Sequence, residues 1–240
     1  MTKLLAFLLL SCFAGTNGFT TIQQKGSTFA RTSSLQDAPQ SIDELIATPD
    51  IWDPLKESLN MVPAFACTND QGQPLQYQVG ESPLAFFYLD VDAAKSELEK
   101  AKKEVPDLTL NLTPFPLGEV FEMGAKKVAL IVPSQEGIES AGAPAGTNPI
   151  GQQVPLFGCM EMVENLPDGS SMVPLFLSQA EADEAIGMAL DTLPDDQKDK
   201  FKINVFPLAG AVQMQAGTIG KRSFTYVPPT SSLDYLRSLE

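Results

Sequence analysis

Histidine is absent from all 240 residues. Because imidazole is the usual base, nucleophile partner and metal ligand near neutral pH, its absence excludes Ser-His-Asp and Cys-His catalytic sites and histidine-bound metals. The sequence also lacks a glycine-rich phosphate loop of the Walker or dinucleotide type. The acidic segment 195–199 has neither the alternating carboxylates nor the central glycine of a calcium loop. We therefore predict no cofactor, no metal and no enzymatic activity.

Cysteine is scarce, and no Cys-x-x-Cys pair occurs. Cys12 lies near the amino terminus, which leaves Cys67 and Cys159 in the body of the chain. These two occupy matching positions in a repeated motif, so a twofold relation between the repeats could bring their thiols together. Three interpretations stay open: two inert buried thiols, a disulfide, or a reactive pair.

Long apolar runs and basic residues are also few. The longest apolar run, Leu4 to Leu10, is too short to span a membrane, so we expect at most a peripheral membrane association. The formal net charge is −14, from 30 acidic and 16 basic side chains. Phosphates and anionic lipids would be repelled by such a surface, so nucleic acid is not an expected partner. Solubility, or attraction to a basic partner, fits the charge better.

The first 40 residues have the composition of targeting segments. Residues 1–18 combine a charged start, a short apolar run and small residues, which is typical of a signal peptide. Residues 19–40 are rich in Ser and Thr and contain no acid before Asp37, as in a transit peptide. With Phe19 at the junction, this leader resembles the plastid-targeting leaders of algae with complex plastids. The alternative is a secreted protein with a Ser/Thr-rich start.

A duplication organises the rest of the chain. Val62–Cys67 returns 92 positions later as Val154–Cys159, and further matches follow in the same order. Such internal similarity predicts two tandem copies of one folding module. We place the first repeat at 62–141, a Gly/Pro-rich linker at 142–153 and the second repeat at 154–240. The further matches are Phe115-Pro116-Leu117 with Phe206-Pro207-Leu208, and Val132-Pro133 with Val227-Pro228.

Each repeat reads as strands, one long amphipathic helix, then strands. The prediction is an α+β fold of two tandem pseudo-symmetric repeats, each a sheet covered by one long helix. Residues 117–123 are expected to form a short irregular or helical turn. The expected strands are 62–67, 75–79, 84–89, 108–112, 128–132, 154–163, 172–177, 201–206 and 223–227, and the expected helices are 91–105, 179–193 and 231–240.

Residues 41–61 are predicted to form a helical brace of two short helices. Ser41 followed by Glu44 three residues later is a capping box that begins the first helix, which Pro49 should end. Asp53-Pro54 then offers a second N-cap with proline at the first helical position. Leu55 and Leu59 would share the buried face of this second helix.

Four phenylalanines are candidate binding residues: Phe65, Phe115, Phe157 and Phe206. Phenylalanines on a sheet face can line a groove for extended apolar peptides. The same residues are expected in strands that pack under a helix, so a core role is the alternative for each of them.

The order of these motifs resembles the Tic twenty-two-like family: helical brace, Val-Pro-x-Phe opening, capped Ala-rich helix, Phe-Pro-Leu turn and Val-Pro exit, given twice. That family is the soluble intermembrane-space component of the translocon at the plastid inner envelope. The resemblance covers about residues 50–240. It implies a non-enzymatic import factor that binds precursor proteins like a chaperone, with other translocon subunits as partners.

The resemblance further implies that apolar pockets between the repeats form the binding site. With the leader, it implies the intermembrane or periplastidial space of a complex plastid. Two alternatives remain: a thiol or redox enzyme that uses Cys67 and Cys159, and a purely structural bridge within a translocon.

Overall fold

A computed structural model describes residues 41–165, 171–191, 194, 198–217 and 222–240. The predicted signal peptide and transit-like segment, and most of the acidic segment 195–199, lie outside the described residues.

The described chain begins with two helices, α1 (Ile42–Ile46) and α2 (Pro49–Asn60). The Ser41 capping box is confirmed, because the Glu44 N–H donates to Ser41 Oγ and the Ser41 N–H donates to Glu44 Oε2, each at 3.2 Å. The predicted boundary between the helices is wrong. Pro49 starts α2 instead of ending α1, since proline at the first helical position needs no N–H partner, and Pro54 lies inside the helix.

The first sheet has strand order β2-β3-β1-β4, with β5 parallel to β3 on its other side. β1 runs antiparallel to β3 and β4, and the pair Pro63 and Pro116 marks the β1–β4 register. The strands are β1 (Pro63–Thr68), β2 (Gln76–Val79), β3 (Ser82–Tyr88), β4 (Asn111–Pro116) and β5 (Ala129–Val132), and the helices are α3 (Val91–Glu104), α4 (Leu117–Ala125) and α5 (Gln135–Ser140).

The second sheet has strand order β10-β8-β6-β9, with β7 also paired to β8. Here β10 is parallel to β8, and the pair Pro155 and Pro207 marks the antiparallel β6–β9 register. The strands are β6 (Pro155–Gly158), β7 (Glu164–Asn165), β8 (Ser171–Phe176), β9 (Asn204–Pro207) and β10 (Arg222–Val227), and the helices are α6 (Gln179–Asp191), α8 (Leu208–Ala216) and α9 (Thr230–Arg237).

Three predicted strands end or begin elsewhere. The strand expected at 108–112 is β4, which begins at Asn111 and contains Pro114 and Pro116. As an edge strand, β4 can accommodate proline, which removes a ladder donor. The strand expected at 154–163 stops at Gly158, and the one expected at 201–206 starts only at Asn204.

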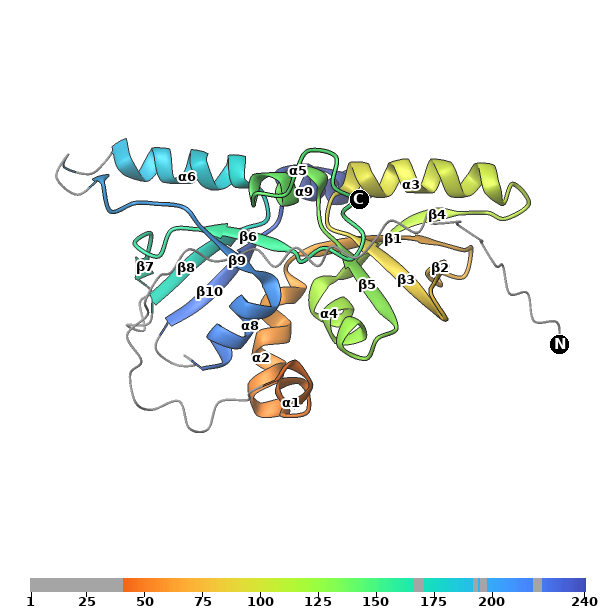
Figure 1. Ribbon diagram of the computed structural model, residues 1–240, viewed down its shortest axis with the longest axis horizontal. Helices are drawn as coiled ribbons and strands as arrows, with labels where there is room; N and C mark the ends of the chain where they lie inside the picture. Colours follow the sequence, from red (N-terminus) through yellow and green to blue (C-terminus); the bar gives the residue numbers. More distant parts are fainter. Residues whose placement is uncertain (1–40, 166–170, 192–193, 195–197, 218–221) are drawn as a thin grey trace.

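The α+β class is confirmed. Figure 1 shows α3 and α6 along one side of the two sheets, with α4, α8, α1 and α2 on the other side. The sequence predicted one helix per sheet. α4 and α8 add a helix on the opposite face of each sheet, where 117–123 was expected to be only a short turn.

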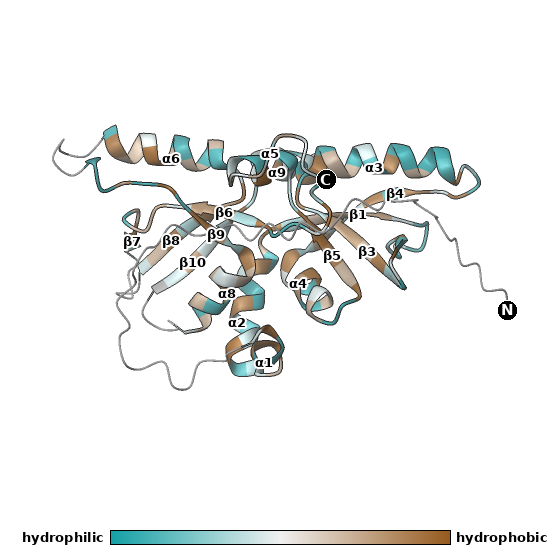
Figure 2. Ribbon diagram, in the orientation of Figure 1, coloured by the Kyte–Doolittle hydropathy of each residue, from teal (hydrophilic) through white to brown (hydrophobic). Residues whose placement is uncertain are grey.

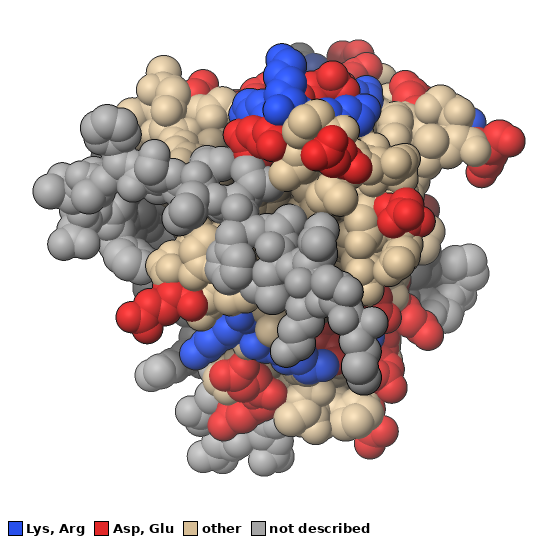
Figure 3. All heavy atoms as spheres, turned by 90° about the vertical axis from the view of Figure 1, so that its right-hand side faces the viewer, with Lys and Arg blue, Asp and Glu red and all other residues tan. Residues whose placement is uncertain are grey.

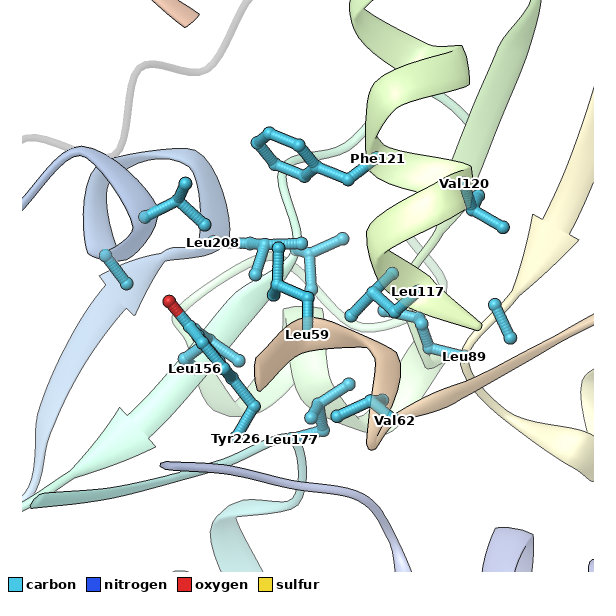
Figure 4. Packing of buried hydrophobic residues seen from close by; sticks show 14 of the residues in the cluster. Leu59, Val62, Leu89, Leu117, Val120, Phe121, Leu156, Leu177, Leu208 and Tyr226 are labelled. Atoms are coloured by element: carbon cyan, nitrogen blue, oxygen red, sulfur yellow. The ribbon is translucent and has the colours of Figure 1, made fainter. Parts of the chain in front are cut away.

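The main core lies on the α4 and α8 side and draws residues from both sheets and both amino-terminal helices. Leu59 of α2 lies within it and is fully buried (Figure 4). Two smaller clusters fill the other side, one under α3 and one under α6. Accordingly, β3 and β5 are mainly hydrophobic in Figure 2, whereas α3 is largely hydrophilic.

Near the top of Figure 3, basic and acidic side chains lie next to one another. On α3, Lys95 Nζ pairs with Asp92 Oδ1 at 2.9 Å. The last helix of each half, α5 in the first and α9 in the second, brings residues into contact with the other half. Tyr235 of α9 packs edge-on against Phe65 of the first sheet, with ring centroids 5.5 Å apart. Ala141, directly after α5, packs in the cluster under α6.

An ion-pair network fixes α2 on α4. Lys56 Nζ donates to Glu122 Oε2 at 2.8 Å and lies 3.0 Å from Glu119 Oε1. Hydrogen bonds from Lys126 and Lys56 lower the pKa of the Glu122 carboxyl from 4.5 to about 2. The side chain of Trp52, the only tryptophan, lies in the same contact, 5.8 Å from Phe121 between ring centroids.

Candidate functional site

A groove of about 410 Å³ lies between the β5 edge of the first sheet and the start of α8 in the second half. Among the described residues, none of the lining side chains is charged, and the polar ones are Gln152 and Gln153. Figure 4 shows Phe121 on α4 and Leu208 on α8, which belong to both the groove wall and the main core. The lining residues are Ile42, Phe121, Gly124, Ala125, Ala129, Leu130, Ile131, Gly151, Gln152, Gln153, Val154, Pro207, Leu208 and Ala209.

Small residues and a loop create this space. Gly124 at the end of α4 has no atom closer than 3.9 Å to the position that a Cβ would take. At Ala129, another lining residue, the side chain is only a methyl group. Along the second wall the linker 142–153 is not helical, because its glycines 142, 146 and 151 have positive φ angles and prolines interrupt it.

The four phenylalanines predicted from the sequence do not line the groove. Phe65 and Phe157 are fully buried under α3 and α6 respectively. Phe115 and Phe206 lie on the opposite side, in or against the main core, and Phe115 packs edge-on against Phe87 at 5.2 Å. The structure therefore divides the four between two faces of the sheets.

Sequence reasoning missed the residues that do line the groove because most are small or lie in the linker. A usable signal was present: 92 positions after α2, the chain carries the Gly/Pro-rich linker in place of an amphipathic helix. If the predicted repeat holds, a helix at one position and a loop at the matching position would leave an apolar surface uncovered.

Cys67, in β1, and Cys159, just after β6, are free and buried. Burial raises the pKa of the Cys67 thiol to about 11, and burial also raises the pKa of Cys159. Since the thiolate is the reactive form, neither environment activates a nucleophile.

Across the described ranges, none of the helices is long and apolar enough to cross a membrane. Within the same ranges, His, Cys, Asp and Glu side chains form no group of three that could hold a metal ion.

No protein-family model matches the sequence, and a search of curated proteins finds no significant match. Solved structures do match. Tic22 from Plasmodium falciparum superimposes with a TM-score of 0.62 at 20% sequence identity, over 77% of this chain and 96% of that chain. The chain has the Tic22 fold.

A second match leads to the same fold. Anabaena Tic22, described as a protein of protein transport, gives a TM-score of 0.56 at 19% identity over 79% of this chain and 97% of that chain. The Tic22 fold thus accounts for nearly the whole of both solved chains. The resemblance predicted from the order of sequence motifs is confirmed at the level of the fold.

Proposed function

We propose that this chain is a non-enzymatic protein-transport factor that holds apolar segments of precursor proteins in the groove. The observation that carries this proposal is an uncharged, largely apolar groove open to solvent on a chain with a net charge of −14. Binding sites for apolar ligands have this character, with few polar groups in the lining. The likeness to two Tic22 structures, one described with protein transport, supports the same proposal.

Precursor proteins and other translocon subunits are the proposed partners, and the proposed location is the intermembrane or periplastidial space of a complex plastid. A fluorescent protein fused to the carboxyl terminus tests the location. We expect a rim or spots at the plastid boundary. Fluorescence in the Golgi or the culture medium would instead support the secreted alternative.

We also infer that the two halves are copies of one module. The support is the shared register: proline pairs mark β1–β4 and β6–β9, and a parallel strand follows in each half, β5 beside β3 and β10 beside β8. Under this relation Ala129 corresponds to Phe224 and Ile131 to Tyr226.

The redox alternative is weaker because both thiols are buried with raised pKa values. It predicts that replacing Cys67 or Cys159 abolishes activity, whereas the groove proposal predicts full binding by a double Cys→Ser variant that remains folded. The bridge alternative predicts that translocon subunits bind and precursors do not.

Suppression of aggregation tests the binding function. Light scattering of a thermally unfolded test protein should fall when the chain is added without nucleotide. Gly124→Gln should weaken this effect, because Gly124 lines the groove and a Cβ there meets no atom closer than 3.9 Å, so the added side chain can take up groove space. Gly187→Gln is the matched control, since Gly187 is an open helix position in α6 outside the groove lining. Equal suppression by both variants would refute the groove as the site.

A further inference from the structure

The groove has a counterpart in the other half that is already filled. In the second sheet, α2 packs across β10 and α8. Under the register relation, the corresponding surface on the first sheet is formed by β5 and α4. That surface is the groove.

Backbone hydrogen bonding at the two strand edges differs in the same way. The Leu177 N–H donates to the Val227 carbonyl, so the alternate carbonyl of Phe224 points away from β8. Ser58 of α2 donates to that carbonyl at 3.4 Å. α2 thus covers the outer edge of β10.

On the first sheet, the Leu89 N–H donates to the Val132 carbonyl, so the carbonyls of Ala129 and Ile131 point outward. Among the described residues, neither residue makes a hydrogen bond outside the β3–β5 ladder. The groove lies against this edge.

The sequence explains why, among the described residues, no helix lies along the outer edge of β5 as α2 lies along that of β10. The segment 92 positions after α2 is 141–152, which contains three glycines at positive φ and two prolines. Helix formation there would be strongly unfavourable. The space that α2 occupies in one half is left as a loop and a groove in the other.

Side-chain size reinforces the difference. Three groove residues are smaller than their counterparts beside α2, and two of those counterparts bond to each other, Tyr226 Oη donating to Gln215 Oε1 at 3.0 Å. The pairs, groove residue first, are Gly124 and Gln215, Ala129 and Phe224, and Ile131 and Tyr226.

We propose that the groove binds an amphipathic helix of a partner polypeptide, with two large apolar side chains one turn apart, as α2 presents Leu55 and Leu59. This inference rests on the proposed function and names the ligand class of the same site. The uncharged lining selects an apolar helix face, and the acidic chain favours basic residues on the helix's outer face.

A synthetic peptide that copies α2 provides the probe. Its sequence is Pro49–Asn60 with Pro54→Ala, held helical by a hydrocarbon staple that joins the exposed positions 53 and 57. Fluorescence anisotropy of the labelled peptide measures its binding to the full chain. A second peptide carries Leu55→Asp and Leu59→Asp, and a third is an unstapled alternation of Val and Ser of equal length.

We expect saturable binding of the first peptide, and binding at least about tenfold weaker for each of the other two. Gly124→Gln and Ile131→Tyr introduce the residues found at the matching positions beside α2. Each should weaken binding of the first peptide by at least about tenfold, while Gly187→Gln should leave that binding unchanged. Circular dichroism checks that each variant is folded.

Three results would overturn the inference. The Val/Ser peptide could bind more strongly than the stapled helix, the peptide with both Leu→Asp changes could bind as well as the first, or the groove variants could bind the first peptide unchanged. In the last case the peptide binds another surface, such as the one on β10 and α8 that α2 covers. The proposed function can fail separately. If the helical peptide binds but unfolded precursors do not, the groove is a helix-binding site and the proposed binding of precursors is refuted. If precursors bind and the helical peptide does not, the proposed function is supported and the helical ligand is refuted.

Discussion

The same substitution at two glycines of α4 should change stability in opposite directions. A Cβ at Gly118 would lie 2.5 Å from both the Lys56 carbonyl oxygen and Asn60 Oδ1, so α2 would have to move by roughly 1 Å. Overpacking of this kind costs about 1–3 kcal/mol, and alanine regains less than about 1 kcal/mol in a first helical turn. We expect Gly118→Ala to reduce the free energy of unfolding by about 1–2 kcal/mol.

Gly124 is at the other end of the same helix, with no contact closer than 3.9 Å to a new Cβ. Gly124→Ala should therefore increase the free energy of unfolding by about 0.5–1 kcal/mol through helix propensity. Urea denaturation followed by the fluorescence of Trp52 reports directly on the α2–α4 contact, since this buried indole donates to Glu122 Oε2 at 3.5 Å. The reasoning is refuted if Gly118→Ala is as stable as the parent chain, because α2 would then not be held closely against α4.

Three further outcomes are expected. Leu59→Ala, which empties a fully buried position in the main core, should lower the free energy of unfolding by about 2–5 kcal/mol in urea denaturation, and a loss below about 1 kcal/mol would place α2 outside the core. Because the folded pKa of Glu122 lies below its unfolded value, its contribution to stability is present above about pH 4.5 and is lost as the pH falls towards 2. In urea denaturation at a series of pH values, Glu122→Gln should make the free energy of unfolding depend less on pH in that window, and an unchanged dependence would contradict this role of Glu122. Cys67 and Cys159 should resist a thiol reagent in the native chain and both react in urea, as counted by mass spectrometry; rapid native labelling would contradict their burial.

Local chemistry explains what the sequence could predict. The capping box at Ser41 depends on side chains within three residues, and it is present. The similarity of Val62–Cys67 to Val154–Cys159 predicted a strand at each position, and β1 and β6 lie there, because the same apolar pattern favours the same burial. Predictions that depended on one local signal were less secure: Pro49 is compatible with a helix end and with a helix start, and only the packing of α2 decides between them.

The candidate site could not be predicted in the same way. Phe65 and Phe157 were conspicuous by residue type, but the helices over them bury both completely. The groove depends on small residues, such as Gly124 and Ala129, which carry little signal alone. Its position depends on which strand edge a distant helix covers, and that is a tertiary property.

The central claim is that the groove binds apolar segments of precursor proteins. Site-specific photocrosslinking tests it most directly, with a benzophenone amino acid at Gln153, an exposed groove residue, and at Val79, exposed on β2 outside the groove lining. With an unfolded precursor during import, we predict an adduct from position 153 that Gly124→Gln diminishes, and little or none from position 79. Equal adducts from both positions, or an adduct from position 79 alone, would contradict the claim.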